Sequence, residues 1–152
     1  MLKKILFLLV LGLSITSANA ADVRLNINKG DKSMVSVSDY QAVKDTISKY
    51  LEAGKQGKSE IMKHAFHKDA IMYNADKGAI EGGNIQALFD YIDNNPAASD
   101  MEADITSVDI AGNIAYARVE SNNWHGARFS DMFLLLKDNG EWKILTKVFY
   151  SN

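Results

Sequence analysis

Cysteine is absent from the 152 residues of this chain, and proline occurs once, as Pro96. Without cysteine the protein cannot form disulfide bonds, and it lacks the thiol that lipoprotein acylation requires. Its stability must therefore come from a hydrophobic core, and a chain of this length is long enough to build one as a single domain.

Arginine is also scarce. Guanidinium groups come only from Arg24, Arg118 and Arg128, the lysines are scattered, and the formal net charge is −2. A dense basic face of the kind that binds nucleic acid is therefore missing, and we expect no nucleic-acid partner. The patterns of a nucleophile elbow, a phosphate-binding glycine loop and a zinc-binding helix are missing too, which disfavours covalent hydrolases, nucleotide-dependent enzymes and metalloproteases.

The first 20 residues have the pattern of a secretory signal peptide. Lys3 and Lys4 precede an apolar stretch at 5–15, and Ala18-Asn19-Ala20 has the small-x-small form that signal peptidase cleaves. A membrane anchor is the alternative, but the apolar stretch is about half of the roughly 20 residues that span a bilayer. We expect cleavage after Ala20 and a periplasmic or secreted protein without a membrane partner.

Helical periodicity begins well after the signal. Residues 21–37 are small and polar and predict an extended lead-in, followed by one domain at 38–152. Apolar residues at steps of three and four, capping residues and turn signals then predict the elements of the first half of this domain. These are a helix from Ser38 to about Lys55, a short helix capped by Ser59, a hairpin at 69–81 and a helix from Asn84 to Pro96.

The chain from Met101 onward predicts antiparallel strands that end in a hairpin with strands 129–137 and 141–150. Helices followed by strands in this order predict an α+β fold, in which a curved sheet wraps around helices and leaves a pocket between them.

The turn of the last hairpin admits two registers. A three-residue loop places Asp131 opposite Lys147, whereas a two-residue loop at Asn139-Gly140 sets Asp138 opposite Glu141 and Asp131 opposite Val148. We favour the three-residue loop because it pairs opposite charges and keeps the two acids apart.

Both faces of the first strand of this hairpin are apolar. We expect one face to be buried against the helices, and it comprises Met132, Leu134 and Leu136, joined in the favoured register by Trp142, Ile144 and Val148. The opposite face is too apolar to be left in water, which predicts a homodimer contact. Its residues are Phe129, Phe133, Leu135, Leu145 and Phe149.

The sequence resembles the exported members of the nuclear transport factor 2-like superfamily that are often called putative lumazine-binding proteins. The resemblance covers about Tyr40 to Tyr150 and is carried by residues 50–54, 65–70, 105–117, 129–137, 142–144 and 147–149. It implies a cone-like, strongly curved antiparallel sheet with three helices on its concave side. Lys68 stands where the family commonly has proline. This superfamily includes isomerases, dehydratases and transport adaptors, so function must be argued from the site.

Aromatic and polar side chains are the candidates for lining the cavity of such a cone. The candidate ligand-binding residues are Tyr50, His67, Tyr73, Trp124 and Asp131, with His64 and His125 as further possibilities. The place of Tyr50 resembles that of a substrate-binding tyrosine in related dehydratases, although a core tyrosine bonded to the backbone fits as well. His64 and His67 lack a third metal ligand nearby, so we expect neither a metal nor a cofactor.

Asp131 is the carboxylate of greatest interest because it stands in an otherwise apolar strand. It either forms a structural salt bridge with Lys147 or is turned into the cavity by a bulge as a general base. His67 either fixes the turn before the first strand or acts as an acid or base.

Our leading interpretation is an exported dimer with an aromatic-lined cavity that binds a small, partly apolar, ring-containing molecule without transforming it. The first alternative is a cofactor-independent isomerase or dehydratase that uses Asp131 or His67 for proton transfer, with Tyr50 stabilising an enolate. The second alternative is a protein-interaction module that uses the outer face of the sheet.

Overall fold

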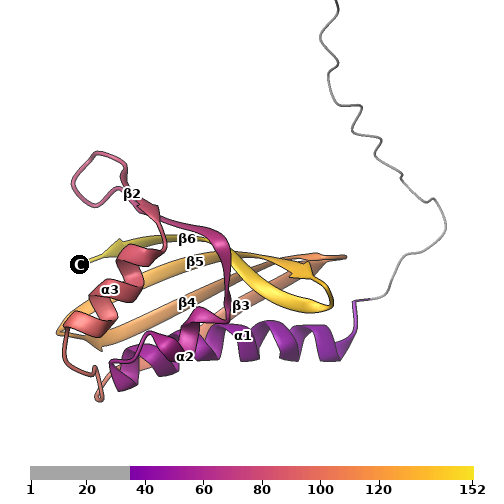
Figure 1. The fold of residues 1–152 in the computed structure, drawn as a ribbon, viewed down its shortest axis with the longest axis horizontal. Coiled ribbons are helices and arrows are strands. Elements are labelled where there is room, and N and C mark those ends of the chain that lie inside the picture. Colours follow the sequence, from indigo (N-terminus) through magenta and orange to yellow (C-terminus); the bar gives the residue numbers. More distant parts are fainter. Residues whose placement is uncertain (1–34) are drawn as a thin grey trace, which may run out of the picture. The chain divides into compact units, whose positions relative to one another are not determined.

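The computed structural model describes residues 35–152 (Figure 1). The predicted signal peptide at 1–20 and most of the predicted lead-in lie outside the described residues. Within residues 35–152, none of the helices combines the length and the apolar character that a bilayer crossing demands.

The described part contains three helices, as predicted, and they are α1 (Val37–Gln56), α2 (Glu60–Lys63) and α3 (Gln86–Asn94). Helix α1 begins where Ser36 Oγ accepts a hydrogen bond from the backbone N–H of Asp39 at 3.1 Å, and it ends at Gly57 in the left-handed conformation. Ser59 was expected to cap α2, but its hydroxyl donates to Asp93 on α3 at 2.7 Å instead. This bond joins α2 to α3.

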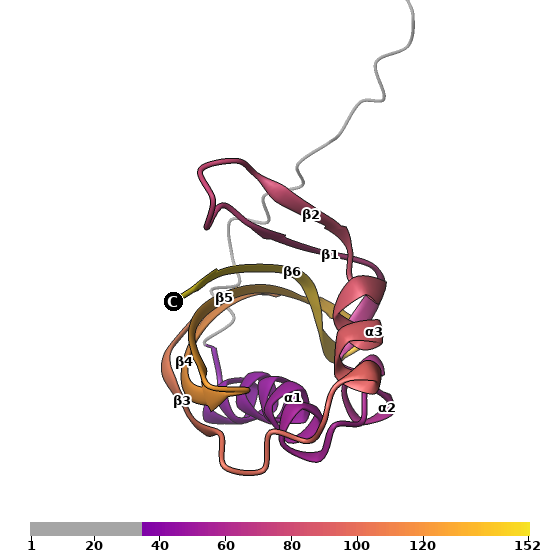
Figure 2. The same cartoon turned by 90° about the vertical axis from the view of Figure 1, so that its left-hand side faces the viewer.

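Six strands form one sheet in the order β2-β1-β6-β5-β4-β3. They are β1 (Phe66–Asn74), β2 (Glu81–Asn84), β3 (Glu102–Ala111), β4 (Ile114–Trp124), β5 (Ala127–Asp138) and β6 (Glu141–Ser151). Figure 2 shows the strands from β3 to β6 curling around α1, so the predicted α+β fold with a curved sheet and helices on its concave side is confirmed. The sheet is not wholly antiparallel, since β1 and β6 run parallel.

The register of the β5–β6 hairpin differs from the one we favoured. Asp138 pairs with Glu141 across a two-residue turn, and φ is +49° at Asn139 and +86° at Gly140. Positive φ at both central residues is the geometry that matches the twist of a hairpin, and an Asn-Gly pair adopts it readily. The facing acids are tolerated because both are exposed and Lys143 pairs with Glu141 at 2.8 Å.

A bulge in β6 then changes which residues face inward. Leu135 pairs with Ile144 and Leu134 pairs with Thr146, so Leu145 is an extra residue. Residues beyond the bulge have the opposite parity: Lys147 joins the buried side, and Val148, which we expected to be buried, is 47% exposed. Asp131 consequently pairs with Phe149 rather than with Lys147 or Val148.

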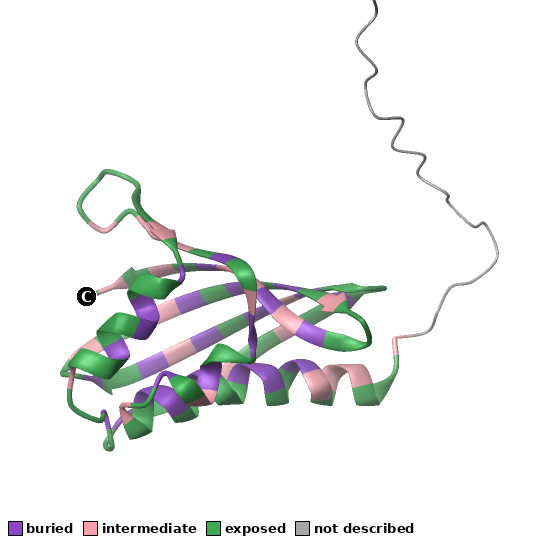
Figure 3. Ribbon diagram, in the orientation of Figure 1, coloured by how far each residue is buried: buried purple, intermediate pink, exposed green. Residues whose placement is uncertain are grey.

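The predicted burial of the two faces of β5 is reversed (Figure 3). Phe133 and Leu135 are buried in the core together with Asp131, whereas the outward residues Met132, Leu134 and Leu136 are exposed. Asp131 belongs to the buried face because hydrogen bonds satisfy its charge there, and those bonds join residues far apart in the sequence.

Most of the residues that we predicted for a homodimer contact are therefore wrong, although Leu145 does line a groove on the outer side of the sheet. Phe133 and Leu135 pack inside the protomer, and Phe129 and Phe149 are half-buried around an internal cavity. Besides Ile71 on β1, the large apolar side chains that the sheet does present to solvent are Ile114, Met132, Leu134, Leu136, Val148 and Tyr150. We call these six residues the outer apolar face.

Candidate ligand-binding site

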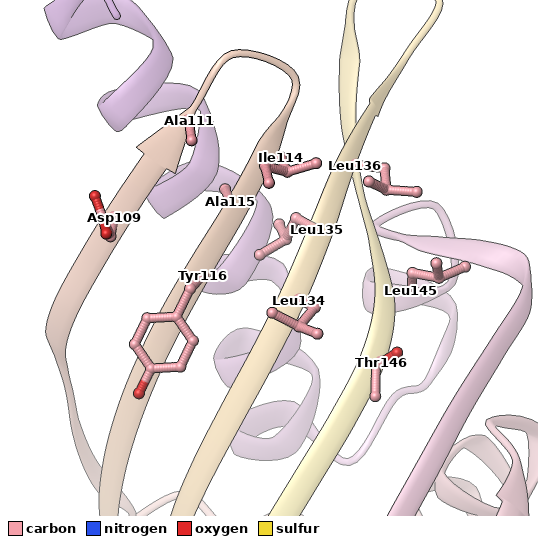
Figure 4. Close-up of a pocket in the computed structure, with 10 residues that line it drawn as sticks. All are labelled: Asp109, Ala111, Ile114, Ala115, Tyr116, Leu134, Leu135, Leu136, Leu145 and Thr146. Carbon is pink, nitrogen blue, oxygen red and sulfur yellow. The ribbon is translucent and has the colours of Figure 1, made fainter. Parts of the chain in front are cut away.

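Two depressions of similar size lie on opposite sides of the sheet. The inner cavity has a volume of about 320 Å³ and is lined by Tyr50, Met72, Ala87, Leu88, Tyr91, Trp124, Phe129, Lys147 and Phe149. The outer groove has a volume of about 300 Å³ and lies along β3 to β6, where Figure 4 shows Leu134, Leu136 and Tyr116 among its lining side chains. The buried cation Lys147 lines the inner cavity and not the outer groove, so the inner cavity is the candidate site.

The floor of the inner cavity is a hydrogen-bonded group of three side chains from three elements. Lys147 Nζ on β6 donates to Asp131 Oδ1 on β5 at 2.6 Å, and the Tyr50 hydroxyl on α1 donates to Asp131 Oδ2 at 2.7 Å. Lys147 and Tyr50 line the cavity, whereas Asp131 is fully buried behind them. Asp131 thus contacts the cavity only through its two partners.

Burial sets the protonation behaviour of this group. It lowers the pKa of Lys147, and the negative charge of Asp131 opposes that shift in part. Burial, reinforced by Asp131, raises the pKa of Tyr50 well above its ordinary value, so the phenol stays protonated and remains a donor. The cavity therefore receives an amine whose charged form is destabilised by burial, next to a carboxylate that can accept a proton from it.

Aromatic rings surround the amine. Lys147 Nζ lies 3.9 Å from the ring centroid of Phe149 and 5.7 Å from that of Tyr50. Contacts of this type stabilise the cation where water is excluded. They also leave Asp131 as the only hydrogen-bond partner of Nζ within residues 35–152.

Trp124, at the end of β4, forms a wall of the cavity. Its ring centroid is 5.2 Å from that of Tyr50 and 5.9 Å from that of Phe129. Gly54 on α1 makes room for it, since a Cβ at that position would lie 2.6 Å from Trp124 Cζ2. Trp124 Nε1 is buried without a hydrogen-bond partner among the described residues.

The β4–β5 turn beside this wall is fastened to α3. His125 Nε2 donates to the carbonyl oxygen of Pro96 at 2.7 Å, and in the neutral ring Nδ1 accepts from the Tyr91 hydroxyl at 2.7 Å. Asn123 and His125 both have positive φ, at +58° and +54°. Because Tyr91 also lines the cavity, this turn and α3 hold one part of its rim together.

The structure brings some of the predicted site residues together and separates others. Tyr50 and Trp124 line the inner cavity and Asp131 lies behind it, bonded to Lys147 as the salt-bridge alternative predicted. His67 lies in another depression, where its Nδ1 accepts from the backbone of Asp69 at 3.2 Å, and Tyr73 is on β1 opposite Gly82. Neither residue lines the inner cavity.

The sequence analysis missed the roles of Lys147, Phe129 and Phe149 in the cavity. Lys147 was expected only as the partner of Asp131, and the two phenylalanines were assigned to the outer face. The bulge at Leu145 determines which side of β6 carries Lys147 and Phe149. An apolar strand that offers hydrophobic residues at both parities gives no local signal of such a bulge.

Comparison with known proteins finds relatives whose own length is covered almost completely by this chain. A Cladobotryum protein named aldolase FrzH is 30% identical over 118 residues, which cover 77% of this chain and 94% of that protein. A crystal structure of an NTF2-like protein of unknown function from Shewanella baltica is 38% identical with a TM-score of 0.74, covering 76% of this chain and 95% of the other.

A second NTF2-like protein of unknown function, from Methylobacillus flagellatus, is 39% identical with a TM-score of 0.74 and covers 78% of this chain and 96% of its own. The family model described as "Putative lumazine-binding" matches residues 38–150, which include every strand and helix that forms the inner cavity except the first residue of α1 and the last residue of β6. The chain therefore belongs to the putative lumazine-binding family of the nuclear transport factor 2-like superfamily.

Proposed function

We propose that the protein binds a small, partly apolar, ring-containing molecule in the inner cavity, with an electron-rich oxygen of that molecule placed against Lys147. One observation carries the proposal: a buried amine stands at the floor of a cavity that is otherwise mostly aromatic and aliphatic. Apolar pockets with a few convergent polar groups are the usual form of small-molecule sites. The volume is near the lower end of their range of about 300–1,000 Å³, which suits a ligand of one or two rings.

The walls support a flat ligand. Trp124, Phe129 and Phe149 offer aromatic rings against which such a ligand can pack. The description of the family as putative lumazine-binding agrees with a heteroaromatic ring of this size. We propose that orientation comes from Lys147 and Tyr50, and that affinity comes from the rings.

Tryptophan fluorescence tests this proposal directly. The chain has two tryptophans, so a Trp142→Phe variant leaves Trp124 as the only reporter, and it lines the cavity. Titration with lumazine, 2-naphthaldehyde and 1-phenylbutane-1,3-dione should quench this fluorescence saturably for at least one probe. The matched control is Leu134→Ser in the outer groove, which should leave the titration unchanged. The proposal would be contradicted if no probe gave saturable quenching. It would also be contradicted if the Leu134→Ser control lost the quenching that the Trp142→Phe protein shows.

A second candidate function is enzymatic, with proton transfer or carbon–carbon bond chemistry on a carbonyl compound. The Lys147–Asp131–Tyr50 group favours it, and so does the similarity to a Cladobotryum protein named an aldolase. The isomerase or dehydratase alternative assigned the base to Asp131 or His67. Because Asp131 lies behind Lys147 and His67 is elsewhere, Lys147 and Tyr50 are the groups that would contact a substrate in this cavity.

Export and dimerisation belong to the same proposal. We propose that the signal at 1–20 directs the chain to the periplasm or the medium, which amino-terminal sequencing of the exported protein tests, with Ala21 as the expected first residue. We propose a homodimer that pairs two outer apolar faces, because this contiguous apolar surface of the sheet is exposed in the single chain.

A further inference from the structure

Lys147 has an arrangement that a purely structural lysine does not need. Its ammonium group could be satisfied by Asp131 away from any cavity, yet it also lines the space where a ligand is proposed to bind. Its other near neighbours are ring faces of Phe149 and Tyr50, which cannot accept its proton. Nζ is therefore placed between an apolar cavity and the Asp131 carboxylate, and the negative charge of Asp76 also acts on it and opposes the lowering of its pKa.

We infer that Lys147 is a nucleophile, whose Nζ forms an imine with the carbonyl carbon of an aldehyde or ketone bound in the inner cavity. The inference rests on the proposed function, because the carbonyl compound must first occupy that cavity. It goes further by assigning a covalent role to Lys147 and a substrate class to the site.

The charge of the site favours a neutral carbonyl compound over an anion. Asp131 already neutralises Lys147 at 2.6 Å, so the buried pair has no net charge to attract a carboxylate or phosphate. An anionic ligand would also be brought close to the Asp131 carboxylate in a poorly hydrated space, which is unfavourable. A ketone or aldehyde carries no such penalty, and its hydrocarbon part suits the surrounding rings.

The chemical step balances with the groups present. Asp131 takes one proton from the ammonium group, which frees the lone pair on Nζ. Nζ then forms a bond to the carbonyl carbon as the C=O π electrons move to oxygen, one proton passes from nitrogen to that oxygen, and the product is a neutral carbinolamine. Asp131 returns its proton to the carbinolamine hydroxyl, which leaves as water while the nitrogen lone pair forms the C=N bond. The resulting iminium keeps one N–H proton beside the Asp131 carboxylate. The sum is amine plus carbonyl giving imine plus water, without an oxidant or reductant.

Tyr50 is a positioning residue in this scheme. Its hydroxyl holds Asp131 Oδ2 at 2.7 Å and so directs Oδ1 toward Lys147. Burial lowers the pKa of Lys147, which increases the fraction of free amine near neutral pH. Exposed lysines keep their ammonium form under these conditions.

Reductive trapping tests the inference on the full mature chain. The protein is incubated at near-neutral pH with 2-naphthaldehyde, treated with sodium cyanoborohydride, and mapped by peptide mass spectrometry. In parallel, 1-phenylbutane-1,3-dione reports on the same amine without a reductant, because it forms a stable ultraviolet-absorbing enaminone. Lys147 should be modified faster than Lys143 on the same strand, because burial lowers the pKa of Lys147 and the cavity holds the carbonyl compound against its Nζ.

Three variants define the role. Lys147→Arg keeps the charge and the ion pair but should lose the trapped product, whereas the control Lys143→Arg should retain it at Lys147. Tyr50→Phe should leave trapping at Lys147 detectable but shift its pH profile, which a merely structural tyrosine would not do. Circular dichroism checks that each variant is folded.

The outcomes separate this inference from the proposed function. Saturable quenching of Trp124 without modification of Lys147 would overturn the imine and leave ligand binding standing. Equal modification of Lys147 and Lys143 would also overturn it, because the cavity would then give no advantage. Failure of quenching and of trapping together would overturn both, and trapping confined to Lys147 would support both.

Discussion

The two faces of β5 have almost the same hydrophobic content but opposite environments. Phe133 and Leu135 point toward α1 and are completely or almost completely buried, whereas Leu134 between them is 55% exposed. Asp131, the only charged residue between Phe129 and Leu136, is on the buried face. Hydrophobicity alone would have put the charged face outside.

What separates the faces is the hydrogen bonding of Asp131. One carboxylate oxygen accepts from Tyr50 on α1 and the other from Lys147 on β6, so the charge is satisfied in the interior. A buried ion pair of this kind adds little net stability, but it is costly to break. The inner face is accordingly the one on which we propose the ligand site, and the outer face the one on which we propose the dimer contact.

The largest difference in stability should appear between truncations of Phe133 and Leu134, which are adjacent in the sequence but lie on opposite faces of β5. Phe133→Ala removes a ring packed edge-on against Tyr50 and should lower the free energy of unfolding by about 3–5 kcal/mol. Leu134→Ala, on the exposed face, should lower it by less than about 1 kcal/mol in the monomer. Urea unfolding at low protein concentration measures both. Equal losses would mean that the two faces are not distinguished by burial.

The next effect concerns the charge on the inner face. Asp131→Asn leaves Lys147 buried without its counter-charge and should cost about 3 kcal/mol, at the low end for a broken buried pair because the amide keeps an oxygen as acceptor. Adding Lys147→Met should recover part of the loss, since the unpaired charge is then gone. Urea midpoints of the two single variants and the double variant give this coupling. A double variant as unstable as the sum of the singles would show that the residues do not interact.

These faces also mark how far the sequence could predict the structure. Helical periodicity around Tyr50, capping residues and turn signals were enough for three helices, the β1–β2 hairpin and a curved sheet. Tyr50 and Trp124 were predicted at the cavity because they combine a ring with a polar atom. The hairpin turn was misjudged since the repulsion of two exposed acids was weighed above the twist preference of Asn-Gly.

The errors in the second half of β6 follow from one extra residue. Apolar side chains occur at both parities of β6, so only tertiary packing determines where the strand bulges. The bulge at Leu145 exchanges the faces of every residue after it and brings Lys147 to the cavity floor. The hairpin was enough to predict Lys147, 16 positions away, as a partner of Asp131, whereas Tyr50 lies 81 positions away and beyond the reach of local patterns.

A smaller effect on stability, but a large one on mass, is expected on the outer face. Leu134→Asp should convert the proposed dimer into a monomer while changing the unfolding free energy of the protomer by no more than about 0.5 kcal/mol. Light scattering measures the mass. The control Ser48→Asp adds the same charge on the exposed side of α1 and should remain dimeric. A monomeric wild-type protein, or a dimeric Leu134→Asp variant, would exclude this face as the contact.

The smallest effect distinguishes two ion pairs made by the same strand. Lys137, near the end of β5, donates to Asp39 at 2.6 Å, but unlike the Lys147–Asp131 pair this one reaches solvent. The hydrogen bond from Lys137, helped by Ser36, lowers the pKa of Asp39 from 3.8 to about 2. Between these two values the unfolded chain binds more protons than the folded one, so stability falls as pH falls.

The stabilisation from Asp39 should therefore be fully present above about pH 4 and lost as pH approaches the folded pKa of about 2. Urea midpoints of the wild type and of Asp39→Asn should differ at neutral pH and converge near pH 2. Lys137→Met removes the partner and should make the pH profile resemble that of Asp39→Asn. If the urea midpoints of the wild type and of Asp39→Asn still differ by the same amount near pH 2, the Asp39 carboxylate does not carry the effect. The end of β5 that contains Lys137 would then be held by packing alone.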